Sequence, residues 1–337
     1  MKSCVKSSNK WFLIYTGAFL FLIFSFVFGL CLGSTKIGFL QLIEAIASFG
    51  KNGVPERIFW YVRLPRTTAC ILCGAALSVS GAVIQSVLAN RLASPGIIGV
   101  NSGAGLAVTL CTAFGIYGGF RLSLFAFIGA FLSVLTVSYV SSRLGSSKST
   151  VILLGVALNS LLGAFSDAVI TFNPEIGIMR NDFKIGDFSA VTYNKLILAA
   201  VISVIALLLI LTLTNELDIL SLGNETAESL GLNTKLLRMV FLILSALLAG
   251  CAVSIAGLLS FVGLIVPNLV RIITGNKSKH LLPLSVMFGG GFVSLCDTLS
   301  RTVFSPYEIP VGIIMSFLGV PFFIFILIKK KGGHTNA

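Results

Sequence analysis

Long runs of apolar residues follow one another along most of this chain of 337 residues. Hydrophobic residues make up 56% of the chain and charged residues only 11%, whereas a soluble globular domain is about a quarter charged. A membrane-spanning helix needs roughly 20 mostly apolar residues, so the chain has room for about ten spans joined by short loops. We therefore predict an all-α integral membrane protein that forms a single domain over residues 1–337.

The apolar runs give the approximate position of each predicted span. The ten spans are residues 11–32, 63–88, 93–116, 121–142, 150–172, 194–214, 236–256, 258–274, 282–303 and 309–328. The eighth is short and contains Pro267, which leaves nine spans as an alternative. The first run follows three lysines and resembles a signal peptide, but it is too long for the apolar part of one and lacks a clean cleavage site. We expect it to be the first membrane helix.

The distribution of positive charge favours a cytoplasmic N-terminus. With ten spans, both termini lie in the cytoplasm and most lysines and arginines fall on that side, including three consecutive lysines at residues 329–331. The net charge of +12 suits contact with anionic lipid headgroups. We therefore expect a multi-pass protein of the bacterial cytoplasmic membrane, with membrane lipids as partners and no nucleic-acid partner.

No constellation for catalysis or metal binding is evident in the sequence. Cys70 and Cys73 have the spacing of a redox or metal pair, but their neighbours are apolar and we expect them to pack in the interior. His280 and His334 have no evident partner. The chain lacks a nucleotide-binding motif of its own. We therefore predict neither an enzyme nor a resident cofactor or metal.

Ionisable residues are nearly absent from the predicted spans. Asp167 and Asp297 lie toward the outer ends of their spans, whereas carriers driven by ion gradients usually keep a carboxylate near the middle of the bilayer. This distribution argues against a secondary transporter, although that class remains the alternative.

Arginines cluster at the predicted outer surface. Arg63 and Arg66 flank Pro65 at the expected start of the second span, where the positive end of the helix dipole gives them no stabilisation. Contact with lipid phosphates is one explanation. The other is an acidic protein that docks from outside, because guanidinium groups bind carboxylates in a bidentate fashion. Arg301 lies at the outer end of the ninth span, where Asp297, four residues earlier, is able to pair with it.

A polar, helix-forming segment interrupts the apolar runs at about residues 215–235. It carries four of the twelve acidic residues between 216 and 228. We predict two short helices separated by Gly223, with Asn224 as the N-cap of the second, Glu225 and Glu228 in its first turns and Gly231 at its end. Leu220, Leu222, Ala227 and Leu230 are predicted to form its apolar side. Such a pair of helices suits a socket on a cytoplasmic protein; the alternative is a helix resting on lipid, which four acids beside an anionic leaflet disfavour.

Several motifs in combination resemble the FecCD-type permeases of binding-protein-dependent ABC importers, which take up iron–siderophores, haem and cobalamin. The resemblance covers about residues 60–328. The motifs that carry it are Arg63-Leu-Pro-Arg66, Gly74-Ala-Ala-Leu-Ser-Val-Ser-Gly-Ala-Val-Ile-Gln85, the segment from Asn90 to Val100, Leu222-Gly-Asn-Glu-Thr-Ala-Glu-Ser-Leu-Gly231, Gly263-Leu-Ile-Val-Pro-Asn268, Asp297-x-x-x-Arg301 and Glu308-Ile-Pro-Val-Gly312.

The resemblance implies a ten-helix subunit with the architecture of type II ABC importer permeases. It implies a second permease subunit, identical or different, around a central pathway, with cytoplasmic ABC ATPase subunits below and an extracytoplasmic substrate-binding protein above. Arg63, Arg66 and Arg301 match the arginines that meet glutamates of the binding protein. The segment 220–232 matches the coupling helices that enter a cleft of the ATPase. The motifs are shared by siderophore, haem and corrinoid permeases and leave the cargo open.

Three positions depart from the family pattern. Arg91 replaces the proline of an Asn-Pro-Leu-Ala turn, Asn268 replaces the histidine of a Val-Pro-His element, and Asp187 replaces the serine of a Trp-x-x-Gly-Ser segment, which here begins with Phe183. The last change lies on the predicted outer side and bears on binding-protein contact or substrate range. None of the three touches the segment 220–232.

Overall fold

The chain folds into helices joined by short loops. A computed structural model describes residues 2–33, 53–144 and 147–332, and no strand occurs within these ranges. The helices are α1 (Lys2–Cys31), α3 (Val54–Ile58), the π-helix η1 (Phe59–Arg63), α4 (Leu64–Val87), the 3₁₀-helix η2 (Pro95–Ile98), α5 (Val100–Ala113), α6 (Gly119–Arg143), α7 (Lys148–Phe172), α8 (Ile176–Ile185), α9 (Tyr193–Thr212), α10 (Thr214–Ser221), α11 (Asn224–Ser229), α12 (Thr234–Ala256), α13 (Val262–Thr274), α14 (Ser278–Thr302) and α15 (Val311–Gly332).

Each predicted span overlaps an apolar helix. Seven helices in the described part of the chain are long and apolar enough to cross a membrane, and three shorter apolar helices are α5, α13 and α15. The predicted span 93–116 is wrong at its start, because η2 and the left-handed Gly99 (φ +100°) delay the α-helix until Val100. The ten-residue helix α8 was not predicted; it is polar enough to be mistaken for a loop.

The second long helix begins earlier than predicted. Helices α3, η1 and α4 run continuously from Val54 to Val87, so Pro65 lies within the helix and not at its start. The π-turn lies directly before this proline, and the N–H of Leu64 bonds to the carbonyl of Phe59, five residues earlier. The wider turn accommodates a residue whose ring and missing N–H disturb regular α-helical bonding.

Helix α4 lies at the centre of the fold, with α12, α13 and α14 packed against it. Small residues allow the backbones to approach. A Cβ on Gly74 would collide with the carbonyl of Gly289 in α14, and one on Gly81 with the carbonyl of Gly263 in α13. Close approach through glycine is typical of membrane helices, which lack a hydrophobic driving force for association in lipid.

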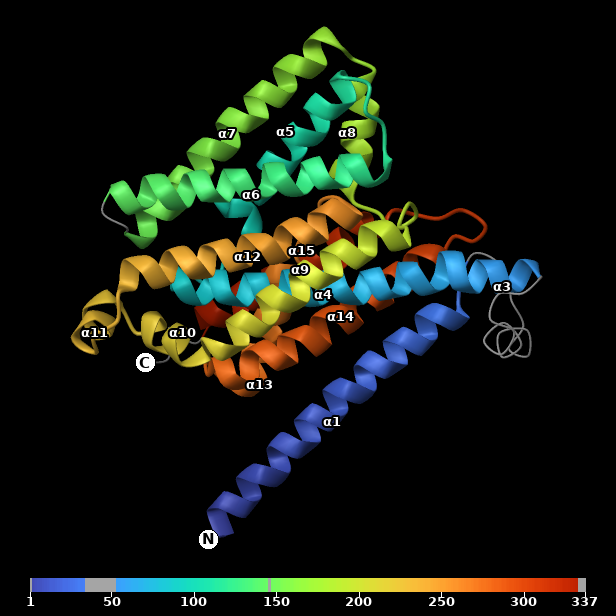
Figure 1. Cartoon of the computed structure of the whole chain (residues 1–337). Helices are drawn as coiled ribbons and strands as arrows, with labels where there is room; N and C mark the ends of the chain where they lie inside the picture. Colours follow the sequence, from blue (N-terminus) through green and yellow to red (C-terminus); the bar gives the residue numbers. More distant parts are fainter. Residues whose placement is uncertain (1, 34–52, 145–146, 333–337) are drawn as a thin grey trace.

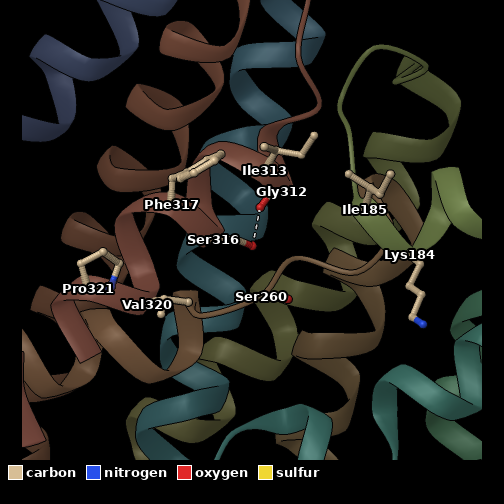
Figure 2. Close-up of a pocket in the computed structure, with 9 residues that line it drawn as sticks. All are labelled: Lys184, Ile185, Ser260, Gly312, Ile313, Ser316, Phe317, Val320 and Pro321. Atoms are coloured by element: carbon tan, nitrogen blue, oxygen red, sulfur yellow. Dashed lines mark hydrogen bonds between the residues drawn. The ribbon is translucent and has the colours of Figure 1, made fainter. Parts of the chain in front are cut away.

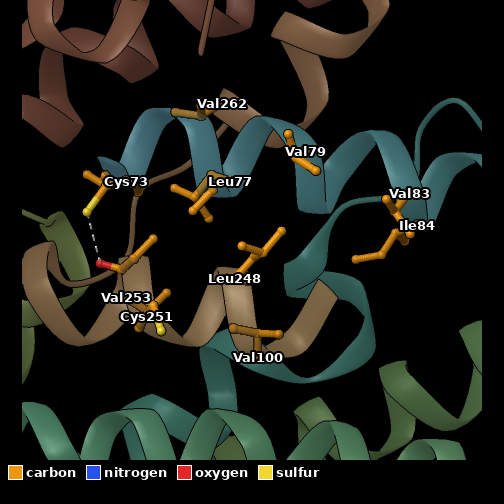
Figure 3. Packing of buried hydrophobic residues seen from close by; sticks show 14 of the residues in the cluster. Cys73, Leu77, Val79, Val83, Ile84, Val100, Leu248, Cys251, Val253 and Val262 are labelled. Atoms are coloured by element: carbon orange, nitrogen blue, oxygen red, sulfur yellow. Dashed lines mark hydrogen bonds between the residues drawn. The ribbon is translucent and has the colours of Figure 1, made fainter. Parts of the chain in front are cut away.

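The two cysteines of α4 belong to this interior, as predicted. Cys70 and Cys73 are fully buried free thiols, and the Cys73 thiol donates to the carbonyl of Ala252 in α12 (3.7 Å). Figure 3 shows Cys73 and Leu77 facing α12, where Leu248 points back toward α4. Within the described residues no cluster of His, Cys, Asp and Glu is able to hold a metal ion.

The remaining helices form a second layer and lie at the two ends of the molecule. Helices α5 to α8 gather beside the central group, and α6 lies along α12 (Figure 1). Helices α10 and α11 lie together at one end of the molecule, and α3 lies at the opposite end (Figure 1).

Helix α1 packs against α14. The ring of His280 stacks on Trp11, with centroids 3.8 Å apart, and its Nδ1 lies 3.0 Å from the hydroxyl of Tyr15. The expectation that His280 has no partner is therefore wrong: its partners come from the first apolar run, about 270 residues away in sequence. His334 lies outside the described residues.

Candidate functional site

A buried cluster of charges joins α4 to α14. Arg66 donates from Nε to Asp297 Oδ1 (3.0 Å) and from Nη1 to Glu308 (2.7 Å), and its Nη2 lies 3.7 Å from Asp187. Arg301 Nε lies 3.0 Å from the other oxygen of Asp297. One buried carboxylate thus bridges two guanidiniums, while Glu308 and Asp187 are partly exposed beside them.

Arg63 has a different environment. Its Nη1 donates to the carbonyls of Leu30 and Cys31, both at 2.8 Å. These are the last carbonyls of α1, which have no partner within their own helix. The guanidinium therefore ties the end of α1 to the start of α4.

The three predicted docking arginines are interior residues in this conformation. Arg63, Arg66 and Arg301 are 2%, 4% and 3% exposed, so their expected exposure to the outer solution is wrong here. Buried guanidiniums require acceptors, and Asp297 and backbone carbonyls provide them. The predicted pair of Asp297 with Arg301 is confirmed. Docking of a partner on these arginines remains a prediction.

Helices α10 and α11 form the predicted pair of short helices, separated as expected near Gly223. The capping differs from the prediction. Gly223, with φ +125°, is the N-cap of α11, and Asn224 is its first residue and caps nothing with its side chain. The Asn224 carboxamide oxygen instead accepts from Arg238 of α12 (2.8 Å). The cap assignment was wrong because a buried arginine on another helix competes for the same oxygen.

The end of α11 is as predicted. Gly231 has φ +82°, its N–H bonds to the carbonyl of Glu228, and the N–H of Leu232 bonds to the carbonyl of Ala227. This pair of bonds is the Schellman arrangement that a left-handed glycine permits. The Glu228 carboxylate accepts from Thr234 at the start of α12 (2.7 Å), which fixes the end of α11 to the next helix.

The predicted apolar side of this segment is divided in two. Leu220 and Ala227 are fully buried against the rest of the chain, whereas Leu222 and Leu230 are 68% and 61% exposed. Glu225 is exposed in the first turn of α11. The single apolar face was wrong because each helix buries one of these residues and exposes the leucine at its C-cap, Leu222 in α10 and Leu230 in α11. The result is a rigid projection with two exposed leucines and an acidic residue.

A groove lies between α5, α7, α8, η2, α13 and α15. It consists of three adjoining hollows of about 590, 410 and 230 Å³. Ser260 lines all three, Lys184 lines the first two, and Asn101 lines the last two. Figure 2 shows the first hollow, where Ser316 and Phe317 of α15 lie across from the end of α8. The groove was not predicted, because its walls come from segments distant in sequence.

Comparison with known proteins agrees with this architecture. The model of the FecCD transport family matches residues 21–329. The chain belongs to the FecCD transport family. Relatives include the iron-uptake system permease protein FeuB of Bacillus subtilis, with 32% identity over 94% of each chain. The vitamin B12 import system permease protein BtuC of Yersinia pseudotuberculosis is 34% identical over 94% of this chain and 93% of its own.

A solved structure also matches the chain along nearly its whole length. It is described as an inward-facing conformation of a metal-chelate type ABC transporter, with a TM-score of 0.83, 28% identity, and coverage of 94% of this chain and 99% of the other. The chain therefore belongs with permease subunits of ABC transporters.

Proposed function

We propose that this chain is the transmembrane permease subunit of an ATP-driven importer of an iron(III)–siderophore or a related metal chelate. Family membership and relatives named for iron and vitamin B12 import support this assignment. The seven long and three shorter apolar helices support ten membrane helices in one domain over residues 1–337. The orientation that we propose places both termini and the α10–α11 projection in the cytoplasm.

The observation that carries the proposal is the rigid α10–α11 projection with its exposed leucines. Two exposed leucines on a short polar segment are unfavourable in contact with water, whereas a socket on an ATPase subunit would bury them. Bonds from Asn224 to Arg238 and from Glu228 to Thr234 fix the projection to α12. Motion of the bound ATPase would therefore move α12 as well.

Replacing Leu222 or Leu230 by Asp tests this contact. In the reconstituted complex we expect binding-protein-stimulated ATP hydrolysis to fall by at least about tenfold. Loss of one buried apolar anchor at an interface reduces the binding free energy by roughly 2 kcal/mol or more. Leu144→Asp is the matched control, because Leu144 is an equally exposed leucine directly after α6 (63%). Normal stimulation in both test variants, with all three proteins folded, would remove the coupling role.

At the opposite end we propose that carboxylates of a substrate-binding protein engage Arg63, Arg66 and Arg301 by exchange with their present partners in this chain. Glu308 is open to such exchange, because its side chain is partly exposed and contacts Arg66 at Nη1. Glu308→Gln removes the competing charge and leaves Asp297 in place. We expect the affinity for the binding protein to rise several-fold, and more so at low salt; an unchanged affinity counts against docking here.

We further propose that a second permease subunit, identical or different, closes the groove into a central pathway. The groove is open along the side of a single chain and has polar groups such as Lys184, Asn101 and Ser260 in its mostly apolar walls. These groups suit burial against another subunit better than contact with lipid. The alternative is a secondary transporter. Uptake by the purified chain alone under an ion gradient would favour it, whereas a requirement for ATP and the ATPase subunits favours the importer.

A further inference from the structure

Two cations of α8 line the groove from one face of that helix. Arg180 and Lys184 both line the 410 Å³ hollow, and Lys184 also lines the 590 Å³ hollow. They are four residues apart, so they lie on the same face of α8, where two like charges destabilise a helix. Two cationic side chains of α8 therefore meet the same hollow.

The charge balance of the groove is positive. Arg180 is paired with Asp167 of α7 at 2.6 Å. Lys184 makes no ion pair or side-chain hydrogen bond within the described part of the chain, and no Asp or Glu is among the described residues that line the three hollows. Asp182 lies on another face of α8, two residues from Lys184. The polar wall otherwise consists of neutral groups such as Asn101, Asn159 and Ser260.

The backbone that carries Lys184 is held in place from two sides. The carbonyl of Phe183 accepts from the N–H of Leu258 (2.9 Å), and the N–H of Asp187 donates to the carbonyl of Ala256 (2.8 Å). The carbonyl of Gly186 accepts from the N–H of Gly312 at the start of α15 (3.2 Å). Figure 2 shows Lys184 at the rim of the hollow, beyond Ser260. The backbone at Lys184 is therefore a fixed part of the groove wall and not part of a free loop.

We propose that the groove takes a metal chelate of net negative charge and that Lys184 is a specificity-determining residue for it. Ferric complexes of catecholates or hydroxycarboxylates carry a net negative charge. In a ferric trihydroxamate the negative charge of the hydroxamate oxygens only balances the positive charge of the ferric ion. A cation on a fixed backbone, in a groove with little competing anion, favours the charged complex. This inference rests on the proposed transport function and adds the class of cargo to it.

Direct binding to the permease tests the inference without the selectivity of the binding protein. The permease–ATPase complex is placed in nanodiscs of phosphatidylcholine, which has no net charge. Binding of radioactive iron(III) held by a tricatecholate is compared with iron(III) held by a trihydroxamate. We expect the wild-type complex to prefer the tricatecholate, and Lys184→Gln to weaken its binding by at least about fivefold. Lys184→Arg should retain most of the affinity, and the trihydroxamate should be unaffected.

The control variant is Lys195→Gln. Lys195 follows Lys184 closely in sequence but lines a different hollow and donates to the carbonyl of Ala190. Equal binding of both probes, no binding of either, or an equal effect of Lys184→Gln on both would overturn the inference. Binding-protein-stimulated ATP hydrolysis is measured on the same samples. Its absence in the wild type would remove the importer function itself, whereas normal stimulation without charge preference removes only the inference about cargo.

Discussion

The carboxylate of Asp297 bridges two buried arginines, and its neutralisation should destabilise the chain strongly. Asp297→Asn keeps the size of the side chain and removes its charge. The carboxylate lies 2.9 Å from Arg66 and 3.0 Å from Arg301. With an effective dielectric constant of about 20, each contact has a Coulomb energy of about 5 kcal/mol before desolvation is subtracted.

The net effect is smaller than the sum of these contacts. Removing one partner of a buried pair typically costs about 3–5 kcal/mol, because the remaining charge stays buried. Arg66 still has Glu308, and the amide oxygen of the new Asn accepts one hydrogen bond, so we expect about 3 kcal/mol. For a chain of this size, at about 2 °C per kcal/mol, the midpoint of thermal unfolding should fall by about 6 °C.

The chain provides its own reporter and control for this measurement. Cys70, Cys73 and Cys296 are fully or almost fully buried, so a thiol-reactive fluorescent dye detects their exposure on unfolding. Asp167→Asn breaks the exposed pair with Arg180 and should cost at most about 1 kcal/mol. If Asp297→Asn lowers the midpoint no more than Asp167→Asn, the charge cluster does not hold α4 to α14 and the reasoning fails.

Two further predictions concern glycines. Gly81→Ala should lower the thermal midpoint, because the new methyl group meets the backbone of Gly263 and overpacking costs about 1–3 kcal/mol. The control Gly105→Ala has open space around it and should leave the midpoint unchanged. Equal midpoints for the two variants would contradict close packing of α4 on α13. Gly223→Ala imposes strain of about 1–3 kcal/mol, because φ +125° with ψ 160° is a region that essentially only glycine adopts. Stimulated ATP hydrolysis should fall, and the midpoint should drop by about 2–6 °C; normal hydrolysis would show that the turn tolerates a side chain.

The helices could be predicted because an apolar run long enough to cross a bilayer has few possible structures other than a membrane-spanning helix. Local chemistry also located the break at Gly223 and the helix end at Gly231, since both glycines adopt positive φ. The polar helix α8 escaped prediction because it is short and its apolar residues are too few to form a run.

Long-range partners could not be predicted from the sequence. Whether Arg66 faces out or in depends on Glu308, 242 residues later, and the role of Asn224 depends on Arg238 in the following span. The pairing of Asp297 with Arg301 was accessible because both lie on one helix, four residues apart. The groove required the positions of several helices at once, so no single motif indicated it.

Helix α14 connects the two ends of the molecule. At its start the N–H of Ser278 donates to Asp218 of α10 (2.9 Å), and near its other end are Asp297 and Arg301. Its 25 residues extend over about 37 Å, with Pro283 in the part nearer Ser278. Tight packing of Gly289 on Gly74 opposes a bend midway. In the orientation that we propose, a displacement of one end of α14 is expected to move the other end, so that a single helix couples the two sides of the membrane.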